Sequence, residues 1–230
     1  MRLVAFGDSF VFGSELDDCN RLNPLSPSLN TWPAIVADKL GIEYVCLAHP
    51  GCSNYDIMRR LCVYNELLKA DDIVVVCWTW MHRFSYYDED KKNGKNWMIL
   101  HDSDDRCWQN ISPYQCLDAD SRDLYFKFLH SDSWCKSQAL QQINLALELL
   151  KKNKTVMTCI EDLIWDKEFH CPEHIRFLQN KARPNITDFQ GENFLDWSKS
   201  NGFDIGPNGH PLEAAHAAAA ELLFPRFLQS

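Results

Sequence analysis

The chain has 230 residues, 46% of them hydrophobic, and a formal net charge of −9 at pH 7. This length and composition suffice for one large domain with a substantial core. The acidic balance argues against a nucleic-acid partner and against docking on anionic membranes, because both interactions favour basic patches. We therefore expect neither partner, and the sequence leaves the oligomeric state open.

The first half of the chain predicts alternating strands and helices. Residues 2–7 form an apolar run that predicts a buried strand, and residues 43–48 predict a second strand. Between them, a helix is expected that begins at a capping Asn30 or Thr31 and ends at Gly41. A further helix begins at Ser53, and the β-branched run at residues 73–77 predicts a central parallel strand covered on both faces.

The second half continues this alternation after an interruption. Residues 85–132 are rich in Asp, Trp and Tyr and show no clear period, which indicates an insertion over the sheet. A long helix over 134–150, a strand over 155–160 and a last helix over 211–223 follow, and a fifth strand is expected to be short or missing. The order predicts an α/β protein: a three-layer α/β/α sandwich with a flavodoxin-like, mainly parallel sheet of about four to five strands. We expect a single domain over residues 1–230.

The ten cysteines do not indicate a disulfide framework. Cys46, Cys77 and Cys159 fall within or beside strand-like runs, where a free cysteine acts as a small hydrophobe, and no Cys-x-x-Cys pair occurs. There is no charged-then-apolar leader and no apolar run of about 18 residues. We expect a reduced, cytoplasmic protein. Pairing stays open for four cysteines in polar stretches: Cys107, Cys116, Cys135 and Cys171.

A serine near the start and a histidine near the end carry the chemistry. Ser9 lies in Gly7-Asp8-Ser9, directly after the first strand, at the edge of an open α/β sheet where ligands bind. His210-Pro211 precedes the last helix. A serine needs a base to become a nucleophile, so the pair predicts acyl-transfer chemistry.

These blocks resemble the SGNH (GDSL-type) hydrolase superfamily. The resemblance rests on Gly7-Asp8-Ser9, on Gly51 after the second strand and on His210-Pro211, and it spans the whole chain in order and spacing. It implies a serine esterase or deacylase with Ser9 as nucleophile and His210 as base. The backbone N–H groups of Ser9 and Gly51 would hold the oxyanion, and no metal or organic cofactor is implied.

The first departure from the family pattern concerns the oxyanion hole. The family usually has Gly-x-Asn-Asp after the third strand, and its asparagine donates to the oxyanion, whereas this chain reads Cys77-Trp78-Thr79-Trp80. Losing one such donor costs about 10²–10³ in rate. Thr79 can substitute through its hydroxyl, or Asn54 through its amide, and Asn54 is slightly favoured. A Trp-Thr variant among phage-encoded members is similar.

The second departure concerns the acid that orients the histidine. The family places an aspartate three residues before the histidine, and this chain has Pro207 there. Asp204, six residues before His210, is the best candidate if the Gly-Pro-Asn-Gly segment folds back. A backbone carbonyl in that place and a dyad without an acid are the alternatives.

Other polar and aromatic residues have weaker roles in this prediction. His216 is expected to be a packed or capping group. Arg83 can bind an anionic substrate group or pair with a carboxylate, and Asp8 is expected to stiffen the turn. Trp78 and Trp80, at the end of the third strand, can form an aromatic floor for a sugar ring or an acyl chain.

Three further tryptophans lie in or beside the insertion: Trp97, Trp108 and Trp134. The insertion also contains an acidic cluster of Asp102, Asp104 and Asp105. The acidic cluster reads as a solvated loop, because no histidine-carboxylate spacing supports a metal site. We therefore expect no metal.

Three hypotheses follow for function. The first is a serine hydrolase that cleaves an acyl ester, including an O-acetyl group on a carbohydrate. The second, motivated by the two departures, is a hydrolase-like scaffold with little turnover that serves as a ligand-binding or interaction module. A flavodoxin-like nucleotide binder is the third and the weakest, because residues 7–13 lack a phosphate-cradling glycine pattern.

Overall fold

A parallel four-stranded sheet forms the centre of the molecule. The computed structural model describes residues 1–19, 26–87, 108–111, 119–164 and 172–228. The strands β1 (Arg2–Phe6), β2 (Glu43–Cys46), β3 (Ile73–Trp78) and β6 (Lys154–Cys159) lie in the order β2-β1-β3-β6. All three pairings are parallel. Every residue of β3 is buried, which agrees with the central position that its β-branched run predicts.

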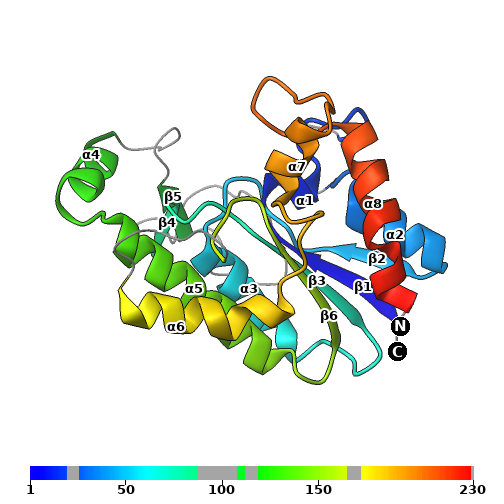
Figure 1. The fold of residues 1–230 in the computed structure, drawn as a ribbon, viewed down its shortest axis with the longest axis horizontal. Helices are drawn as coiled ribbons and strands as arrows, with labels where there is room; N and C mark the ends of the chain where they lie inside the picture. The colour runs from blue at the N-terminus through cyan, green and yellow to red at the C-terminus, as the bar shows by residue number, and fades with distance from the viewer. Residues whose placement is uncertain (20–25, 88–107, 112–118, 165–171, 229–230) are drawn as a thin grey trace, which may run out of the picture.

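Helices cover both faces of this sheet (Figure 1). On one side lie α1 (Ser9–Phe12), α2 (Trp32–Leu40), α7 (Phe194–Ser200) and α8 (Glu213–Leu228). On the other side lie α3 (Asn54–Asn65), α5 (Asp132–Leu149) and α6 (Glu173–Ala182). The predicted three-layer α/β/α architecture is confirmed.

The core divides into two clusters because strand residues alternate between the faces. Leu3 and Ala5 of β1 belong to the cluster under α2 and α8, and Val4 and Phe6 belong to the cluster under α3 and α5. This alternation gives each layer of helices its own buried apolar surface.

The helix ends follow the capping signals of the sequence. Gly41 ends α2 in the left-handed conformation, with φ of 65°. The Ser53 hydroxyl accepts a hydrogen bond from Asp56 N at the start of α3. These caps determine where the chain leaves each helix toward the next strand.

The expected short fifth strand is a single bridge. Ile186 pairs with Met157 of β6 in a parallel bridge, and Thr187 N donates to Met157 O at 2.7 Å. The 3-10 helix η3 (Arg183–Asn185) comes directly before it and contains Pro184. The chain therefore reaches the sheet edge for one bridge and leaves again.

The predicted insertion contains regular elements that its sequence did not indicate. β4 (Phe84–Tyr87) and β5 (Trp108–Ile111) form an antiparallel pair, and α4 (Ala119–Phe128) precedes α5. Several residues of the sequence-based predictions lie outside the described residues: Trp97, Asp102, Asp104, Asp105, Cys107, Cys116 and Cys171. The expectation of a single domain stays a prediction.

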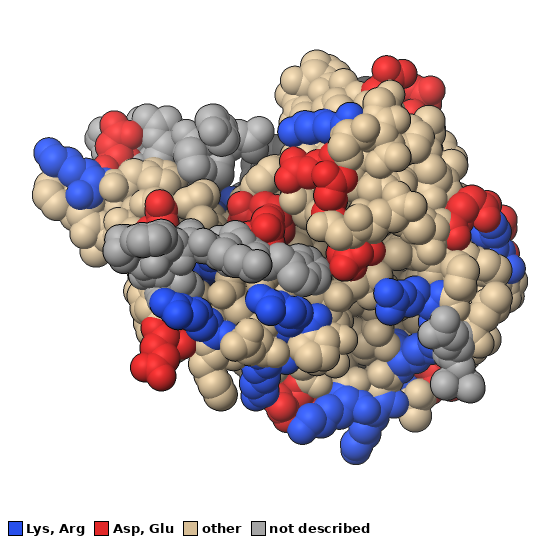
Figure 2. All heavy atoms as spheres, viewed as in Figure 1, with Lys and Arg blue, Asp and Glu red and all other residues tan. Residues whose placement is uncertain are grey.

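Within the described ranges, no helix combines the length and the apolar character needed to cross a bilayer. The cysteines of this part of the chain are free thiols, including Cys46, Cys77 and Cys159. On the face drawn in Figure 2, Lys and Arg lie mainly over the lower half, and Asp and Glu mainly over the upper half.

Candidate active site

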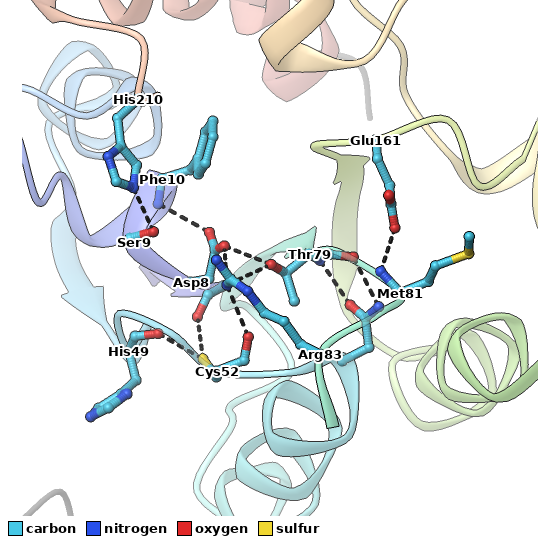
Figure 3. Close-up of polar contacts among 12 residues, drawn as sticks. Asp8, Ser9, Phe10, His49, Cys52, Thr79, Met81, Arg83, Glu161 and His210 are labelled. Carbon is cyan, nitrogen blue, oxygen red and sulfur yellow. Dashed lines mark hydrogen bonds and ion pairs between the residues drawn. The ribbon is translucent and has the colours of Figure 1, made fainter. Parts of the chain in front are cut away.

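The two ends of the chain meet at Ser9 and His210. β1 ends at Phe6, and Asp8 caps α1 by accepting a hydrogen bond from Phe10 N at 3.0 Å. Ser9 is therefore the first residue of a short helix at the carboxyl end of β1. Its Oγ lies 2.7 Å from Nε2 of His210, which is 201 residues away in the sequence (Figure 3). This is hydrogen-bond distance for proton transfer between a nucleophile and its base.

A tight loop before α8 places the His210 imidazole. Gly206 N donates to His210 O at 2.7 Å, and Ile205 bridges Pro211 across the same turn. The ring of Phe10 lies against the imidazole with ring centroids 4.9 Å apart. The loop and this aromatic contact together restrict the rotation of the side chain.

The carboxylate beside His210 is Glu15, which corrects the expectation of Asp204. Glu15 Oε2 lies 2.6 Å from His210 Nδ1, and the Glu15 side chain is only 2% exposed. Asp204 is exposed, and its backbone oxygen accepts from Leu212 N. The segment before His210 folds so that the backbone N–H groups of Asn208 and His210 donate to the Glu15 carboxylate.

Sequence reasoning missed Glu15 because it follows the nucleophile instead of preceding the histidine. It lies just after α1, in a polar stretch that continues with Asp17 and Asp18. The available signal was weak: an acidic side chain about one helical turn beyond the end of the serine helix. Nothing in its spacing distinguished it from its acidic neighbours.

The loop Gly206–His210 surrounds the Glu15 carboxylate with donors. Asn208 donates through its backbone N–H and its side-chain amide, and His210 donates through its backbone N–H. Burial opposes ionisation of Glu15, but the hydrogen bonds from His210 and Asn208 outweigh it and lower the pKa of Glu15 below its ordinary value.

An ionised Glu15 determines the tautomer of His210. A carboxylate can accept hydrogen bonds but cannot donate them, so Nδ1 of His210 carries a proton. In the neutral imidazole, Nε2 then has a lone pair directed at the Ser9 hydroxyl. This is the protonation state that a general base for Ser9 requires.

Gly206 allows the carboxylate to approach the loop this closely. A Cβ at position 206 would lie 2.8 Å from Cδ of Glu15 and 2.8 Å from its Oε2. Any larger residue would displace the carboxylate, so a glycine here is required for the Glu15–His210 contact.

Gly51 lies in a turn that packs against the end of β1. Cys52 N donates to His49 O at 3.3 Å, and His49 N donates to Gly7 O at 3.0 Å. Gly51 has φ of 82°, which is the value that the third position of a type II turn requires. The turn therefore lies beside the Gly7-Asp8-Ser9 segment, as the family resemblance implies. Donation from Gly51 N–H to an oxyanion stays a proposal.

Thr79 and Asn54 hold each other in place, and this changes the predicted role of Thr79. Asn54 Nδ2 donates to Thr79 O at 2.9 Å, and Thr79 N donates to Asn54 Oδ1 at 2.8 Å. The Thr79 hydroxyl donates to Asp8 Oδ2 at 2.6 Å. Its single proton is thus committed to Asp8, which corrects the expectation that this hydroxyl donates to an oxyanion.

Arg83 pairs with a buried carboxylate, which is one of its two predicted roles. Its Nη1 lies 2.7 Å from Oδ2 of Asp8, whose side chain is fully buried, and it also reaches Cys52 O and Thr79 Oγ1 (Figure 3). Arg83 thus joins the loop after β3 to the residue beside Ser9 and to the Gly51 turn.

Glu161 supports the same loop from the end of β6, and no sequence signal indicated this. Its carboxylate accepts a hydrogen bond from Met81 N (Figure 3). The segment from Thr79 to Arg83 is therefore held at three points, by Asn54, Asp8 and Glu161.

The predicted aromatic floor is not formed. Trp78 is completely buried in the core beneath α3 and α5, so it cannot contact a substrate. Trp80 is partly buried and packs against the opposite core cluster. β3 ends at Trp78, so Trp80 lies in the loop beyond it, where strand alternation no longer sets the direction of the side chain. The assignment of Trp78 to substrate binding is therefore wrong.

A cavity of about 240 Å³ lies next to this network. Arg83 and Asn54 line one part of it, and Tyr125, Trp134 and Cys135 line another. It occupies the space between α3, β4 and the start of α5.

His216 has the capping role that the sequence suggested. Its Nδ1 accepts a hydrogen bond from Trp32 N at 3.1 Å, at the start of α2, where the Thr31 side chain does not cap the helix. Burial lowers the pKa of His216 to about 3, with a smaller contribution from His210. A neutral imidazole is required, because a protonated Nδ1 cannot accept from Trp32.

This buried histidine predicts a loss of stability in mild acid. In the unfolded chain its pKa is about 6.5, so below that pH the unfolded state binds a proton that the folded state excludes. The free energy of unfolding should fall as pH drops from about 6.5 toward 3, by up to about 1.4 kcal/mol per pH unit. Urea unfolding of His216→Gln should lack this slope between about pH 6.5 and 5, whereas exposed His174→Gln should retain it. Equal slopes for both variants would contradict the assignment.

Comparisons by sequence give no relatives for this chain. No protein-family model matches it, and no curated protein matches it.

Comparison of structures gives many matches. A lipolytic G-D-S-L family protein from Veillonella parvula matches with a TM-score of 0.52 and 13% identity, covering 100% of this chain and 99% of that one. LAE5, an α/β hydrolase from the metagenome of Lake Arreo, matches with a TM-score of 0.51 and 13% identity, over 100% and 96% of the chains. A carbohydrate esterase matches with a TM-score of 0.51 and 14% identity, over 100% of this chain and 69% of the other.

The fold class follows from these matches and from the layers described above. The chain has the fold of lipolytic G-D-S-L proteins, as the resemblance of Gly7-Asp8-Ser9, Gly51 and His210-Pro211 implied.

Proposed function

We propose that this protein is a serine ester hydrolase that works through an acyl-enzyme on Ser9. The observation that supports it most is the continuous chain from Ser9 Oγ to His210 Nε2, at 2.7 Å, and from His210 Nδ1 to Glu15 Oε2, at 2.6 Å. A nucleophile, its base and an orienting acid are the three groups that acyl transfer at a serine needs.

In the first half-reaction, Ser9 Oγ attacks the ester carbonyl carbon. His210 Nε2 takes the hydroxyl proton, and the ionised Glu15 stabilises the resulting imidazolium. The tetrahedral intermediate then collapses: the bond to the alcohol oxygen breaks, and His210 returns its proton to that oxygen. The products of this step are the free alcohol and an ester of Ser9.

In the second half-reaction, water replaces the alcohol. His210 Nε2 takes a proton from the water as its oxygen attacks the acyl carbon, and the bond to Ser9 Oγ breaks. The proton passes from His210 to Ser9, and the acid is released.

Backbone N–H groups of Ser9 and Gly51 are the proposed oxyanion donors. Ser9 N lies at the start of α1, and the Gly51 turn packs against the same strand end. The Asn54 amide keeps one N–H beyond its bond to Thr79, so Asn54 stays a candidate third donor in this proposal. Arg83 acts here as a positioning residue through its contact with Asp8.

An acyl ester is the substrate class, and an O-acetyl group on a carbohydrate is the narrower proposal. One structural neighbour is a carbohydrate esterase, while Trp78 is buried and provides no sugar-stacking surface. A panel of acetyl esters and longer acyl esters tests this narrower part. A location in the cytoplasm stays a prediction.

A serine-directed fluorophosphonate probe tests the proposed function. We expect the probe to label the folded wild-type protein on Ser9, with the modified peptide identified by mass spectrometry. Labelling requires a nucleophilic serine with a working base, so Ser9→Ala and His210→Ala should not be labelled.

Ser14→Ala is a matched control, because Ser14 is a neighbouring serine whose hydroxyl has no hydrogen-bond partner in the described structure. It should be labelled like the wild type. A folded wild-type protein that resists the probe and hydrolyses no chromogenic ester would contradict the proposal. That result would favour the alternative, a scaffold that binds a ligand with little turnover. The observation that supports this alternative is that the Thr79 hydroxyl donates its proton to Asp8 and so does not serve as an oxyanion donor.

A further inference from the structure

A second group of reactive side chains lies at the junction between the loop after β3 and the start of α5. His82 belongs to that loop, His130 lies between α4 and α5, and Asp132 and Cys135 lie in the first turn of α5. Ring nitrogens of His82 and His130 and the sulfur of Cys135 all lie within 4.8 Å of one another. His82 precedes the other three residues by about fifty positions in the sequence, so only the fold brings it beside them.

The two histidine nitrogens and the Asp132 carboxylate lie close together. His82 Nδ1 lies 2.9 Å from His130 Nε2, and Asp132 Oδ1 lies 4.0 Å and 3.8 Å from these two nitrogens. In a tetrahedral zinc site with Zn–N bonds of 2.0–2.1 Å, two nitrogens are about 3.3 Å apart. The nitrogens would therefore need to separate by only about 0.4 Å to admit an ion.

The surroundings hold two of these side chains, Cys135 and His130, in position. Cys135 is 2% exposed, and its sulfur contacts the Tyr125 hydroxyl at 3.6 Å. The rings of Tyr125 and Phe126 pack against the His130 ring, with centroids 6.0 Å and 5.0 Å away. Aromatic packing of this kind fixes ligand orientation, as outer-shell groups of metal sites do.

A different group of similar composition does not meet these requirements. His49, Cys52 and Asp56 also lie within 4.8 Å of one another. However, Asp56 pairs with the guanidinium groups of Arg59 and Arg60, which oppose a cation, and the Cys52 thiol donates to the His49 and Gly7 carbonyls. This second group thus serves as an internal comparison.

We propose that His82, His130, Asp132 and Cys135 bind one zinc ion. Two imidazoles, a thiolate and a carboxylate form a nitrogen- and sulfur-rich tetrahedral set, which favours zinc over magnesium or calcium. With four protein ligands the site is structural: it joins the loop that carries Arg83 to the start of α5, and Cys135 also lines the cavity. This replaces the sequence-based expectation of no metal.

Metal titration of the reduced, chelator-treated full chain tests the site. We expect calorimetry with Zn²⁺ to give one ion per chain and an increase in melting temperature, because zinc binds the folded state preferentially. Co²⁺ should give the visible bands of a tetrahedral site together with a thiolate charge-transfer band.

Ligand variants locate the ion. Cys135→Ser and His130→Gln should each weaken Zn²⁺ binding by at least about 100-fold, since even outer-shell changes cost 10–100-fold, and Cys135→Ser should lose the charge-transfer band. Cys62→Ser and His174→Gln replace an exposed cysteine and an exposed histidine and should bind like the wild type. The far-ultraviolet circular dichroism of each metal-free variant shows that it folds.

Two results would overturn the proposal. One is a folded wild-type chain that binds no Zn²⁺ in calorimetry. The other is Zn²⁺ binding that survives in Cys135→Ser and His130→Gln, or that is lost in His49→Gln instead, because the ion would then be held elsewhere.

Discussion

Replacement of Glu15 by glutamine is expected to lower kcat for ester hydrolysis by about 10⁴-fold, the cost of the comparable substitution in serine proteases. The side chain keeps its size, so the loop Gly206–His210 should keep its shape. What changes is the group that faces Nδ1 of His210 at 2.6 Å.

The physical reason is the tautomer of the imidazole. The amide of a glutamine can donate to Nδ1, which moves the ring proton to Nε2. A protonated Nε2 cannot accept the Ser9 proton across the 2.7 Å contact. The imidazolium also loses the negative charge that stabilises it during the reaction.

Asp204→Asn is the matched control, because the sequence made Asp204 the best candidate for the same role. Asp204 is exposed, so the kcat of the Asp204→Asn variant should equal that of the wild type. Steady-state kinetics on a short chromogenic ester distinguishes the two variants. Unchanged kcat in Glu15→Gln, or a large loss in Asp204→Asn, would remove Glu15 from the proposed triad.

Arg83→Met is expected to destabilise the protein by about 3–5 kcal/mol, because it leaves a buried charge without its partner. The Asp8 side chain is fully buried and its Oδ2 lies 2.7 Å from Arg83 Nη1, whose own side chain is 15% exposed. The Thr79 hydroxyl and Phe10 N still donate to Asp8, but neither supplies a positive charge.

Urea unfolding measures this loss against two references. Arg226→Met removes an exposed arginine on α8 and should change the free energy of unfolding by no more than about 0.5 kcal/mol. Combining Asp8→Asn with Arg83→Met should cost less than the sum of the single changes, since the double variant removes both charges. Additive losses, or an Arg83→Met variant as stable as Arg226→Met, would show that the pair is not coupled.

The sequence alone was sufficient for the layers and for two residues of the candidate site. The apolar run of β1, the β-branched run of β3 and the cap at Ser53 are local patterns, and the structure has elements at these places. Gly7-Asp8-Ser9 and His210 could be identified because each lies beside a recognisable strand or helix end. Local patterning of this kind depends on near neighbours, which the sequence displays directly.

Only the tertiary structure decided which distant groups face each other. Glu15, and not Asp204, contacts His210 because the loop closed by Gly206 and His210 directs its N–H groups to the Glu15 carboxylate. The spacing of residues in the sequence does not predict this loop conformation. The Thr79 hydroxyl donates to Asp8, and His82 meets His130, for the same reason. Hydrogen bonds act over about 3 Å, so partners far apart in sequence are determined by how the loops pack, which one-dimensional patterns do not contain.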